Sequence, residues 1–267
     1  MLRSVKELKG QAIHASDGDL GSVDNFLFDD ESWTVRYLVV ETGKLLERKV
    51  LISPISIDRK QKMDGLKLSL TKEQIRNSPK IDTDKPVSRQ HEAEYFDYYG
   101  YPYYWGGTGL WGRTAYPVGH LSARRSLGYP DRTSGYAGTA ATAKRQAARQ
   151  EGDPHLRSTQ EVIGYYIEAT DGNIGHVEDF LMDDENWAIR YVIVDTVNWW
   201  PGKKVVMAPQ WIKDVSWAES RVYVNHSREH IKNAPEYDPA AMIDRRYENK
   251  LYEHYRSPKY WDENTLI

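Results

Sequence analysis

Short runs in which apolar and polar residues alternate follow one another along the chain, separated by turn residues. Such runs, when they are rich in β-branched and aromatic residues, predict β-strands. In the first half they lie at 11–15, 20–28, 33–41, 49–52 and 65–70, and Ile55 and Ile57 alternate again after Pro54. Both faces of the 33–41 run are mostly apolar, which favours a closed or doubly covered sheet. The pattern therefore predicts a small β-barrel of about six short strands.

Other stretches show helical signals. Thr71-Lys72-Glu73-Gln74 fits a capping box and predicts a short helix that ends before Pro79. Aromatic residues at helical spacing predict two longer helices, at 88–99 and 244–255. The expected fold class is thus all-β with short helices, with a Tyr-rich helical extension after each set of strands.

A long stretch of the sequence occurs twice. Asp17–Thr42 returns as Asp171–Thr196 without a gap, at a shift of 171 − 17 = 154. The match continues in the extensions at a shift of 261 − 105 = 156, where Glu92, Phe96, Tyr99, Pro102, Tyr104 and Trp105 align with Glu248, Tyr252, Tyr255, Pro258, Tyr260 and Trp261. A repeat of this length indicates an internal duplication.

The duplication predicts five regions. They are a first barrel at 1–85, a helical extension at 86–105, a flexible Gly/Ala/Arg linker at 106–154, a second barrel at 155–240 and a second extension at 241–267. The linker has no counterpart in the repeat, and its scattered Arg residues make it mildly basic. We expect it to be solvated, and the alternative is electrostatic docking to an anionic surface or to nucleic acid.

Composition excludes several classes of protein. The formal net charge of −3 argues against a basic nucleic-acid binder. The absence of Cys excludes disulfides, thiolate metal sites and a cysteine nucleophile. No apolar run approaches the roughly 20 residues that span a bilayer, and the first residues are too charged for a signal peptide. We therefore expect a soluble, cytoplasmic protein.

Motifs of catalysis and of metal binding are missing from the sequence. It contains no Gly-rich phosphate loop followed by Lys-Ser/Thr, no Gly-x-Ser-x-Gly and no His-Glu-x-x-His. The acidic turns at 29–31 and 183–185 contain carboxylates, which supply the oxygen ligands that hard cations prefer. Because Asp is also favoured in tight turns, these residues are explained without a metal ion. His226 and His230 are four residues apart, but Ser227 is the expected helix cap between them, which argues against a zinc site. We predict no catalytic, cofactor-binding or metal-binding residues and no enzyme.

The aromatic residues are the candidates for binding. One interpretation is that they pack on their own barrel or on the other half, and the other is that they form an exposed surface for a partner. On the second interpretation, the partner-binding residues are Tyr99, Tyr101, Tyr104, Trp105, Trp199 and Trp200. Arg36 and Arg190, in mid-strand, are expected to pair with a carboxylate such as Glu41, Asp29 or their copies.

The repeated motif resembles the PRC-barrel family. The resemblance is carried by a Gly turn, then Val, Phe-Leu, Asp-Asp, Trp, Arg-Tyr and Val, and a strand ending at Pro: Gly21/Gly175, Val23, Phe26-Leu27, Asp29-Asp30, Trp33, Arg36-Tyr37, Val40 and Pro54/Pro209. This barrel is known from the cytoplasmic part of the photosynthetic reaction centre H subunit and from the C-terminal half of the ribosome maturation factor RimM. Unlike the H subunit, this chain has no N-terminal membrane helix. Unlike RimM, it has a second such barrel where RimM has a different domain.

The resemblance implies two PRC-type barrels in a non-enzymatic binding or scaffold protein, similar to the soluble domain of the H subunit. We expect an unknown protein partner, for which a membrane-associated complex is one candidate, and a homo-oligomer is a further expectation. The alternatives are a RimM-like accessory protein of ribosome or RNA processing, and a protein that binds a small ligand or metal between the barrels.

Overall fold

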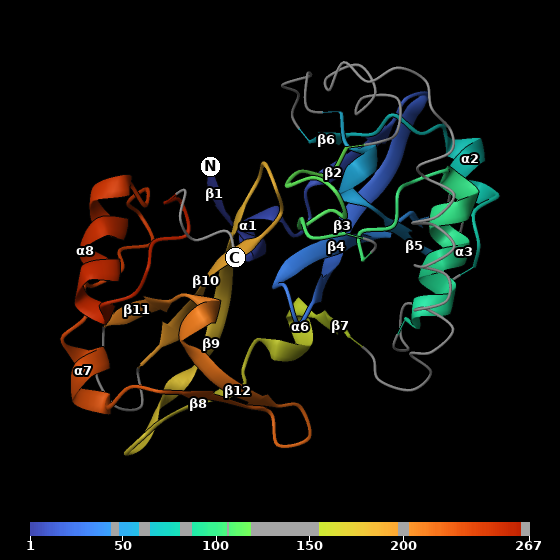
Figure 1. Cartoon of the computed structure of the whole chain (residues 1–267). Helices are drawn as coiled ribbons and strands as arrows, with labels where there is room; N and C mark the ends of the chain where they lie inside the picture. Colours follow the sequence, from blue (N-terminus) through green and yellow to red (C-terminus); the bar gives the residue numbers. More distant parts are fainter. Residues whose placement is uncertain are drawn as a thin grey trace. The chain divides into compact units, whose positions relative to one another are not determined.

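The computed structural model describes residues 1–43, 48–58, 65–80, 87–105, 107–118, 155–196 and 203–262. These residues form two mixed β-sheets with a few short helices (Figure 1), as the alternating pattern predicts. The chain divides into two compact units. The first comprises Met1, Arg3–Gln160 and Asp183–Ala188, and the second comprises Leu2, Glu161–Met182 and Ile189–Ile267.

The first unit is built on a sheet with the strand order β5-β4-β3-β2-β6, and β7 pairs with β3 outside this order. The strands are β2 (Ala12–Ala15), β3 (Gly18–Asp29), β4 (Thr34–Glu41), β5 (Lys49–Ile52), β6 (Leu66–Lys67) and β7 (Leu156–Ser158). Neighbours are antiparallel except β2 and β6, which pair in parallel. The predicted strands are present, although the last one is much shorter than the 65–70 run suggests.

Strand β4 forms the centre of the first unit's core. All its residues from Thr34 to Val40 are buried, so both faces of the strand are covered, as its two apolar faces predict. Next to it, Gly21 lies inside β3, as the predicted strand at 20–28 has it, and not in the turn that the PRC-barrel motif implies for this position. A Cβ atom at Gly21 would lie 1.9 Å from the carbonyl oxygen of Glu41, so only glycine allows the two backbones to approach this closely.

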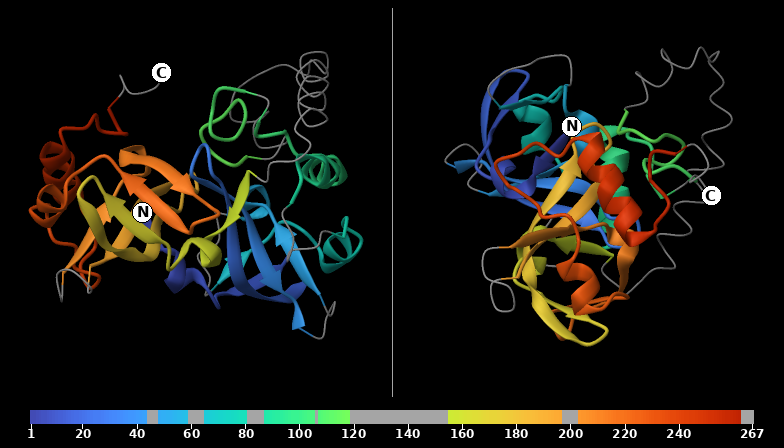
Figure 2. Two further views of the ribbon diagram at one scale, coloured as in Figure 1. Left: turned by 90° about the horizontal axis from the view of Figure 1, so that it is seen from below. Right: turned by 90° about the vertical axis from the view of Figure 1, so that its left-hand side faces the viewer.

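The helices of the first unit begin and end where the capping signals indicate. They are α1 (Val5–Leu8), the 3₁₀ turn η2 (Pro54–Ser56), α2 (Lys72–Arg76) and α3 (Arg89–Tyr99). The predicted capping box of α2 is present, with Thr71 and Gln74 bonding each other's backbone N–H. Helix α3 starts at the cap Ser88 and ends at Gly100, which takes the left-handed conformation. Figure 2 shows α3 running beside its own sheet.

The second unit follows the same order of elements. Its strands are β8 (Tyr166–Ala169), β9 (Gly172–Asp183), β10 (Ile189–Asp195), β11 (Lys204–Met207), β12 (Ile212–Ser216) and β13 (Arg221–Val224), in the order β11-β10-β9-β8-β13-β12. Its helical elements are η3 (Pro209–Trp211), α7 (Arg228–Lys232) and α8 (Arg245–Tyr255). Helix α6 (Thr159–Val162) spans the boundary, because Thr159 and Gln160 belong to the first unit. Strand β1 (Leu2–Ser4) also spans the boundary, because Leu2 belongs to this unit and Arg3 and Ser4 belong to the first.

Two features of the second unit bear on the sequence analysis. Strand β12 was not expected, and it forms an antiparallel pair with β13. Gly175 repeats the close approach of Gly21, because its Cβ would lie 1.9 Å from the carbonyl oxygen of Asp195. Most of the predicted linker, at 106 and 119–154, and the segment 197–202 with Trp199 and Trp200 lie outside the described residues. The strand pairs among the described residues do not close into a ring, so the barrel stays a prediction.

Candidate functional site

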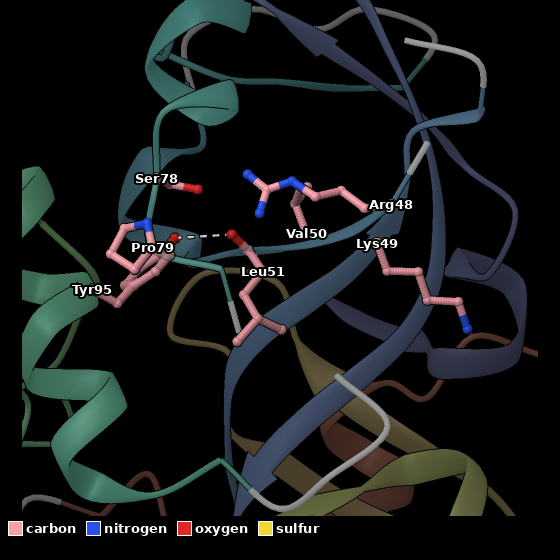
Figure 3. Close-up of a pocket in the computed structure, with 7 residues that line it drawn as sticks. All are labelled: Arg48, Lys49, Val50, Leu51, Ser78, Pro79 and Tyr95. Carbon is pink, nitrogen blue, oxygen red and sulfur yellow. Dashed lines mark hydrogen bonds between the residues drawn. The ribbon is translucent and has the colours of Figure 1, made fainter. Parts of the chain in front are cut away.

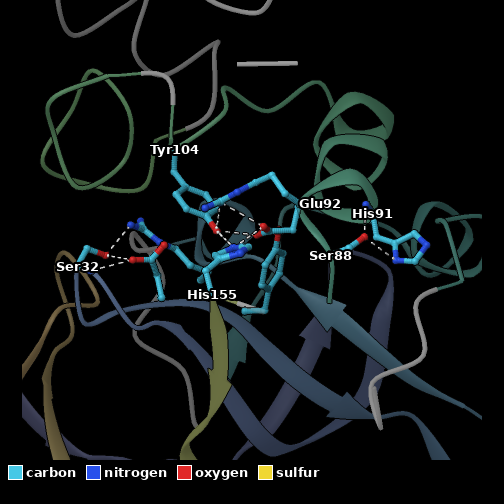
Figure 4. Close-up of polar contacts among 10 residues, drawn as sticks. Ser32, Ser88, His91, Glu92, Tyr104 and His155 are labelled. Atoms are coloured by element: carbon cyan, nitrogen blue, oxygen red, sulfur yellow. Dashed lines mark hydrogen bonds and ion pairs between the residues drawn. The ribbon is translucent and has the colours of Figure 1, made fainter. Parts of the chain in front are cut away.

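A buried polar cluster connects helix α3 to the sheet of the first unit (Figure 4). At its centre, the carboxylate of Glu92 accepts hydrogen bonds from the hydroxyls of Tyr37 on β4 (3.0 Å) and Tyr104 (2.7 Å). Arg89, one helical turn earlier, lies 3.2 Å from the same carboxylate and donates to the Tyr104 hydroxyl at 2.7 Å. His155 Nε2 lies 2.7 Å from Glu92 Oε2. We call these five residues the Glu92 cluster.

Burial makes this cluster sensitive to the loss of any partner. Glu92 is 0% exposed and Arg89 only 6%. Burial raises the pKa of Tyr37 and Tyr104 well above the usual value for tyrosine, and the nearby Glu92 carboxylate raises it further. Both hydroxyls therefore remain protonated and act as hydrogen-bond donors. A buried carboxylate is tolerated when it is paired and hydrogen-bonded in this way.

Arg36 covers the outer side of the Tyr104 ring. Its guanidinium carbon lies 3.9 Å from the centroid of Tyr104 and 4.9 Å from the ring of Trp111. It donates to the carbonyl oxygen of Leu110 and, at 2.9 Å, to the hydroxyl of Ser32. Its hydrogen bonds thus go to a carbonyl and a hydroxyl and not to Glu41 or Asp29. Burial lowers the pKa of Arg36, and the charge of the nearby Asp29 opposes this shift, so the predicted interaction with Asp29 exists only as an electrostatic one.

The second unit contains a matching cluster. Glu248 on α8 accepts hydrogen bonds from Tyr191 on β10 and from Tyr260, both at 2.8 Å, and it pairs with Arg245 at 3.0 Å. Arg190 lies over the Tyr260 ring at 4.1 Å. These five residues, the Glu248 cluster, align one by one with Glu92, Tyr37, Tyr104, Arg89 and Arg36.

The two clusters join three segments in each unit. A central strand supplies one tyrosine, a helix supplies the carboxylate and the arginine, and the segment after the helix supplies the second tyrosine. The Glu92 carboxylate already has four partners and no exposure, so it has no room for a substrate. The arrangement supports packing of each extension on its own sheet.

The predicted partner-binding residues of the first extension contact the rest of their own unit. Tyr104 is buried within the Glu92 cluster. Tyr99 and Tyr101 are half-buried and stack on each other with ring centroids 5.3 Å apart. Trp105 is half-buried and lies over Arg89 at 4.5 Å. Partner binding through Tyr99, Tyr101 and Trp105 stays a prediction, as does binding through Trp199 and Trp200, which lie outside the described residues.

A small pocket opens between β5 and the segment after α2 (Figure 3). It is lined by Arg48, Lys49, Val50, Leu51, Ser78, Pro79 and Tyr95. The space that it encloses is about that of a single water molecule, far below that of a ligand pocket. The Tyr95 hydroxyl closes one side, because it donates to the carbonyl of Leu51 and accepts from the N–H of Ser53.

The acidic turns and the histidines make local contacts. Asp29 accepts hydrogen bonds from the backbone and hydroxyl of Ser32, as turn chemistry predicts. His226 and His230 stack with ring centroids 5.1 Å apart, closer than the sequence suggests, because His226 directly precedes the α7 cap. His254 of α8 continues the stack at 4.4 Å from His230. Among the described residues, no group of three His or acidic side chains is arranged to hold a metal ion.

The sequence aligns Glu92 with Glu248 but does not indicate a role for either residue. The available signal was a carboxylate repeated at matching places among aromatic residues, each with an arginine three residues before it. No local signal marks His155, because it lies at the start of the second repeat and joins the first unit only through the fold.

No protein-family model matches the chain, and no curated protein matches it. Within the described parts of the chain, no helix has the length and apolar character required to cross a membrane.

Proposed function

We propose that the chain is a non-enzymatic binding or scaffold protein made of two PRC-type barrel units that arose by internal duplication. The duplication is supported by the repeated order of elements and by the paired clusters around Glu92 and Glu248. The resemblance of the repeated motif to the PRC-barrel family supports the barrel interpretation. The same resemblance is the basis for two further proposals: that the chain is similar to the soluble domain of the reaction centre H subunit, and that it is located in the cytoplasm.

The observation that carries the proposal is the saturated Glu92 cluster. A catalytic carboxylate needs access to its substrate, whereas Glu92 is fully buried. Its two oxygens are hydrogen-bonded or ion-paired with Tyr37, Tyr104, Arg89 and His155. Its partners hold the aromatic extension against the sheet. Each unit is thereby a rigid platform whose outer surface is available for contacts.

The proposed mechanism is bivalent docking. Each unit offers one weak surface to the partner, and the covalent connection between the units raises the effective concentration of the second contact. The aromatic residues at Trp199 and Trp200 are the contacts proposed for the second unit.

An affinity pull-down after mild cross-linking tests the proposal. The tagged chain is expressed in its own host, and the soluble, ribosomal and membrane fractions are analysed separately by mass spectrometry. We expect one stoichiometric protein complex, which is lost with Trp199→Ser/Trp200→Ser. Tyr166→Ser, at a 50% exposed aromatic residue of the same unit, is the matched control and is expected to retain it.

Other outcomes identify the alternatives. Recovery in the ribosomal fraction supports a RimM-like accessory role. Recovery of the bait alone contradicts the scaffold proposal and leads to a thermal-shift screen with metals, quinones, tetrapyrroles and nucleotides.

A further inference from the structure

The first unit is completed by a strand from the second repeat. Strand β7 pairs antiparallel with the end of β3, in the register Leu27 with Ser158, Phe28 with Arg157 and Asp29 with Leu156. The ladder continues for one more bond, because the N–H of Asp30 donates to the carbonyl of His155. The segment 155–160 thus belongs to the first unit, although it begins the second repeat.

Side chains on both strands fix this register. Arg157 Nε lies 2.8 Å from Asp30 Oδ2, and the two side chains are only 13% and 16% exposed. Asn25 donates to the hydroxyl of Ser158 at 2.7 Å and accepts from the hydroxyl of Thr159 at 3.1 Å. A shift of the strand by one residue would break all three contacts at once.

The first unit contains two segments of the second repeat, 155–160 and Asp183–Ala188. Both segments come after residues 119–154 in the chain. In the second segment, the carbonyls of Asn186 and Trp187 accept from the indole of Trp111 and the N–H of Val35. A second copy of the chain can supply both segments with the same contacts, because both lie on the same side of residues 119–154 in the sequence.

We propose that two copies of the chain exchange β7, so that β3 of each copy pairs with β7 of the other in a reciprocal dimer. Exchange of identical elements costs little, because each contact of the closed form is made again between chains. The partner is a second copy because the β3 edge matches the sequence His-Leu-Arg-Ser-Thr-Gln, which this chain carries at 155–160.

Cysteine trapping tests the exchange in the full chain, which has no natural Cys. One copy carries Asn25→Cys and a differently sized tagged copy carries Ser158→Cys. These side chains meet when β7 pairs with β3, and neither copy can close the disulfide within itself. The two copies are unfolded, mixed, refolded at several concentrations and oxidised, and the products are separated on a non-reducing gel.

We expect a disulfide-linked heterodimer whose share rises with protein concentration during refolding. Asn25→Cys mixed with Met242→Cys, at a 75% exposed position, is the control and is expected to give no heterodimer above background. The double variant Asn25→Cys/Ser158→Cys in one chain is expected to form an internal disulfide, which shows that the pair can react. If the double variant closes and the mixture yields no heterodimer at any concentration, the exchange proposal is overturned.

Discussion

The Glu92 and Glu248 clusters share a glutamate, an arginine and two tyrosines, which lie in two different settings. In the first unit, the arginine that pairs with the carboxylate is 6% exposed, and His155 adds a further partner at 2.7 Å. In the second unit, the corresponding Arg245 is 51% exposed. An arginine in water keeps much of its hydration when its partner is lost, whereas a buried one does not.

The difference arises from the residues that enclose the first cluster. After Trp105, the chain continues across this cluster, where the carbonyl of Leu110 accepts from Arg36 and Trp111 is 2% exposed. His155 reaches the same cluster from the start of the second repeat. The first cluster is therefore enclosed by residues outside the repeated motif, and the same motif is expected to contribute more to stability there.

The largest expected difference is between Glu92→Gln and Glu248→Gln. Glu92→Gln leaves the buried Arg89 without its counter-charge, and we expect a loss of about 3–5 kcal/mol in the free energy of unfolding of the first unit. In Glu248→Gln, the arginine that loses its counter-charge is exposed to water. We therefore expect the free energy of unfolding of the second unit to fall by only about 1 kcal/mol. Hydrogen exchange in urea, read on peptides of α3 and α8, measures the two units separately.

Glu94→Gln, on the exposed side of α3, is the matched control and is expected to leave both units unchanged. Equal losses for Glu92→Gln and Glu248→Gln would show that enclosure of the first cluster does not matter.

A second difference lies at the edge strands. In the first unit, the Tyr95 hydroxyl bonds both the carbonyl of Leu51 and the N–H of Ser53, whereas the aligned residue in the second unit is Leu251, which has no polar group. Tyr95→Phe leaves both buried backbone groups unpaired, and we expect a cost of about 1–3 kcal/mol. Equilibrium urea unfolding measures it.

Tyr255→Phe provides the contrast for that measurement. The Tyr255 hydroxyl is buried and has no hydrogen-bond partner among the described residues. Its removal is expected to leave stability unchanged or slightly raised. A similar loss for both substitutions would mean that the cost comes from removing a buried hydroxyl in general and not from its bonds to the β5 strand and Ser53.

The sequence predicts the local elements of both units well because their signals are local. The strand patterns, the capping box at Thr71 and the helix at 88–99 depend on neighbouring residues, and the structure contains them. The alignment of Glu92 with Glu248 is also visible in the sequence. Their bonding partners are not visible in it. The spacing of residues along a helix predicts which face of the helix a side chain lies on, but not which distant residue that side chain contacts.

Contacts between distant segments are the part that sequence reasoning misses. Strand β7 joins β3 more than a hundred residues away, and its three residues carry too short a pattern to indicate a strand. Arg36 was expected to pair with a nearby carboxylate, but it bonds the carbonyl of Leu110, a group that every residue carries. The sequence therefore does not indicate which backbone carbonyl accepts a hydrogen bond from Arg36.

The smallest expected effect is a pH dependence confined to the second unit. Burial lowers the pKa of His226 and His230 below the usual 6.5, and the neighbouring His254 lowers it further. Arg256 also lowers the pKa of His230. Because the unfolded chain then binds more protons than the folded one, the contribution to stability is complete above about pH 6.5 and is lost as the pH falls below it.

Hydrogen exchange on α7 and α8 peptides at pH 7.5 and 5, corrected for the intrinsic exchange rate, measures this loss. The double variant His226→Phe/His230→Phe keeps aromatic rings in the stack and removes the titrating groups, so the pH dependence in the second unit is expected to shrink. No stacked histidines occur in the described part of the first unit, where His14 and His155 each face a carboxylate. A loss of the same size in α3 peptides would assign the effect to general acid destabilisation, because the stack is present only in the second unit.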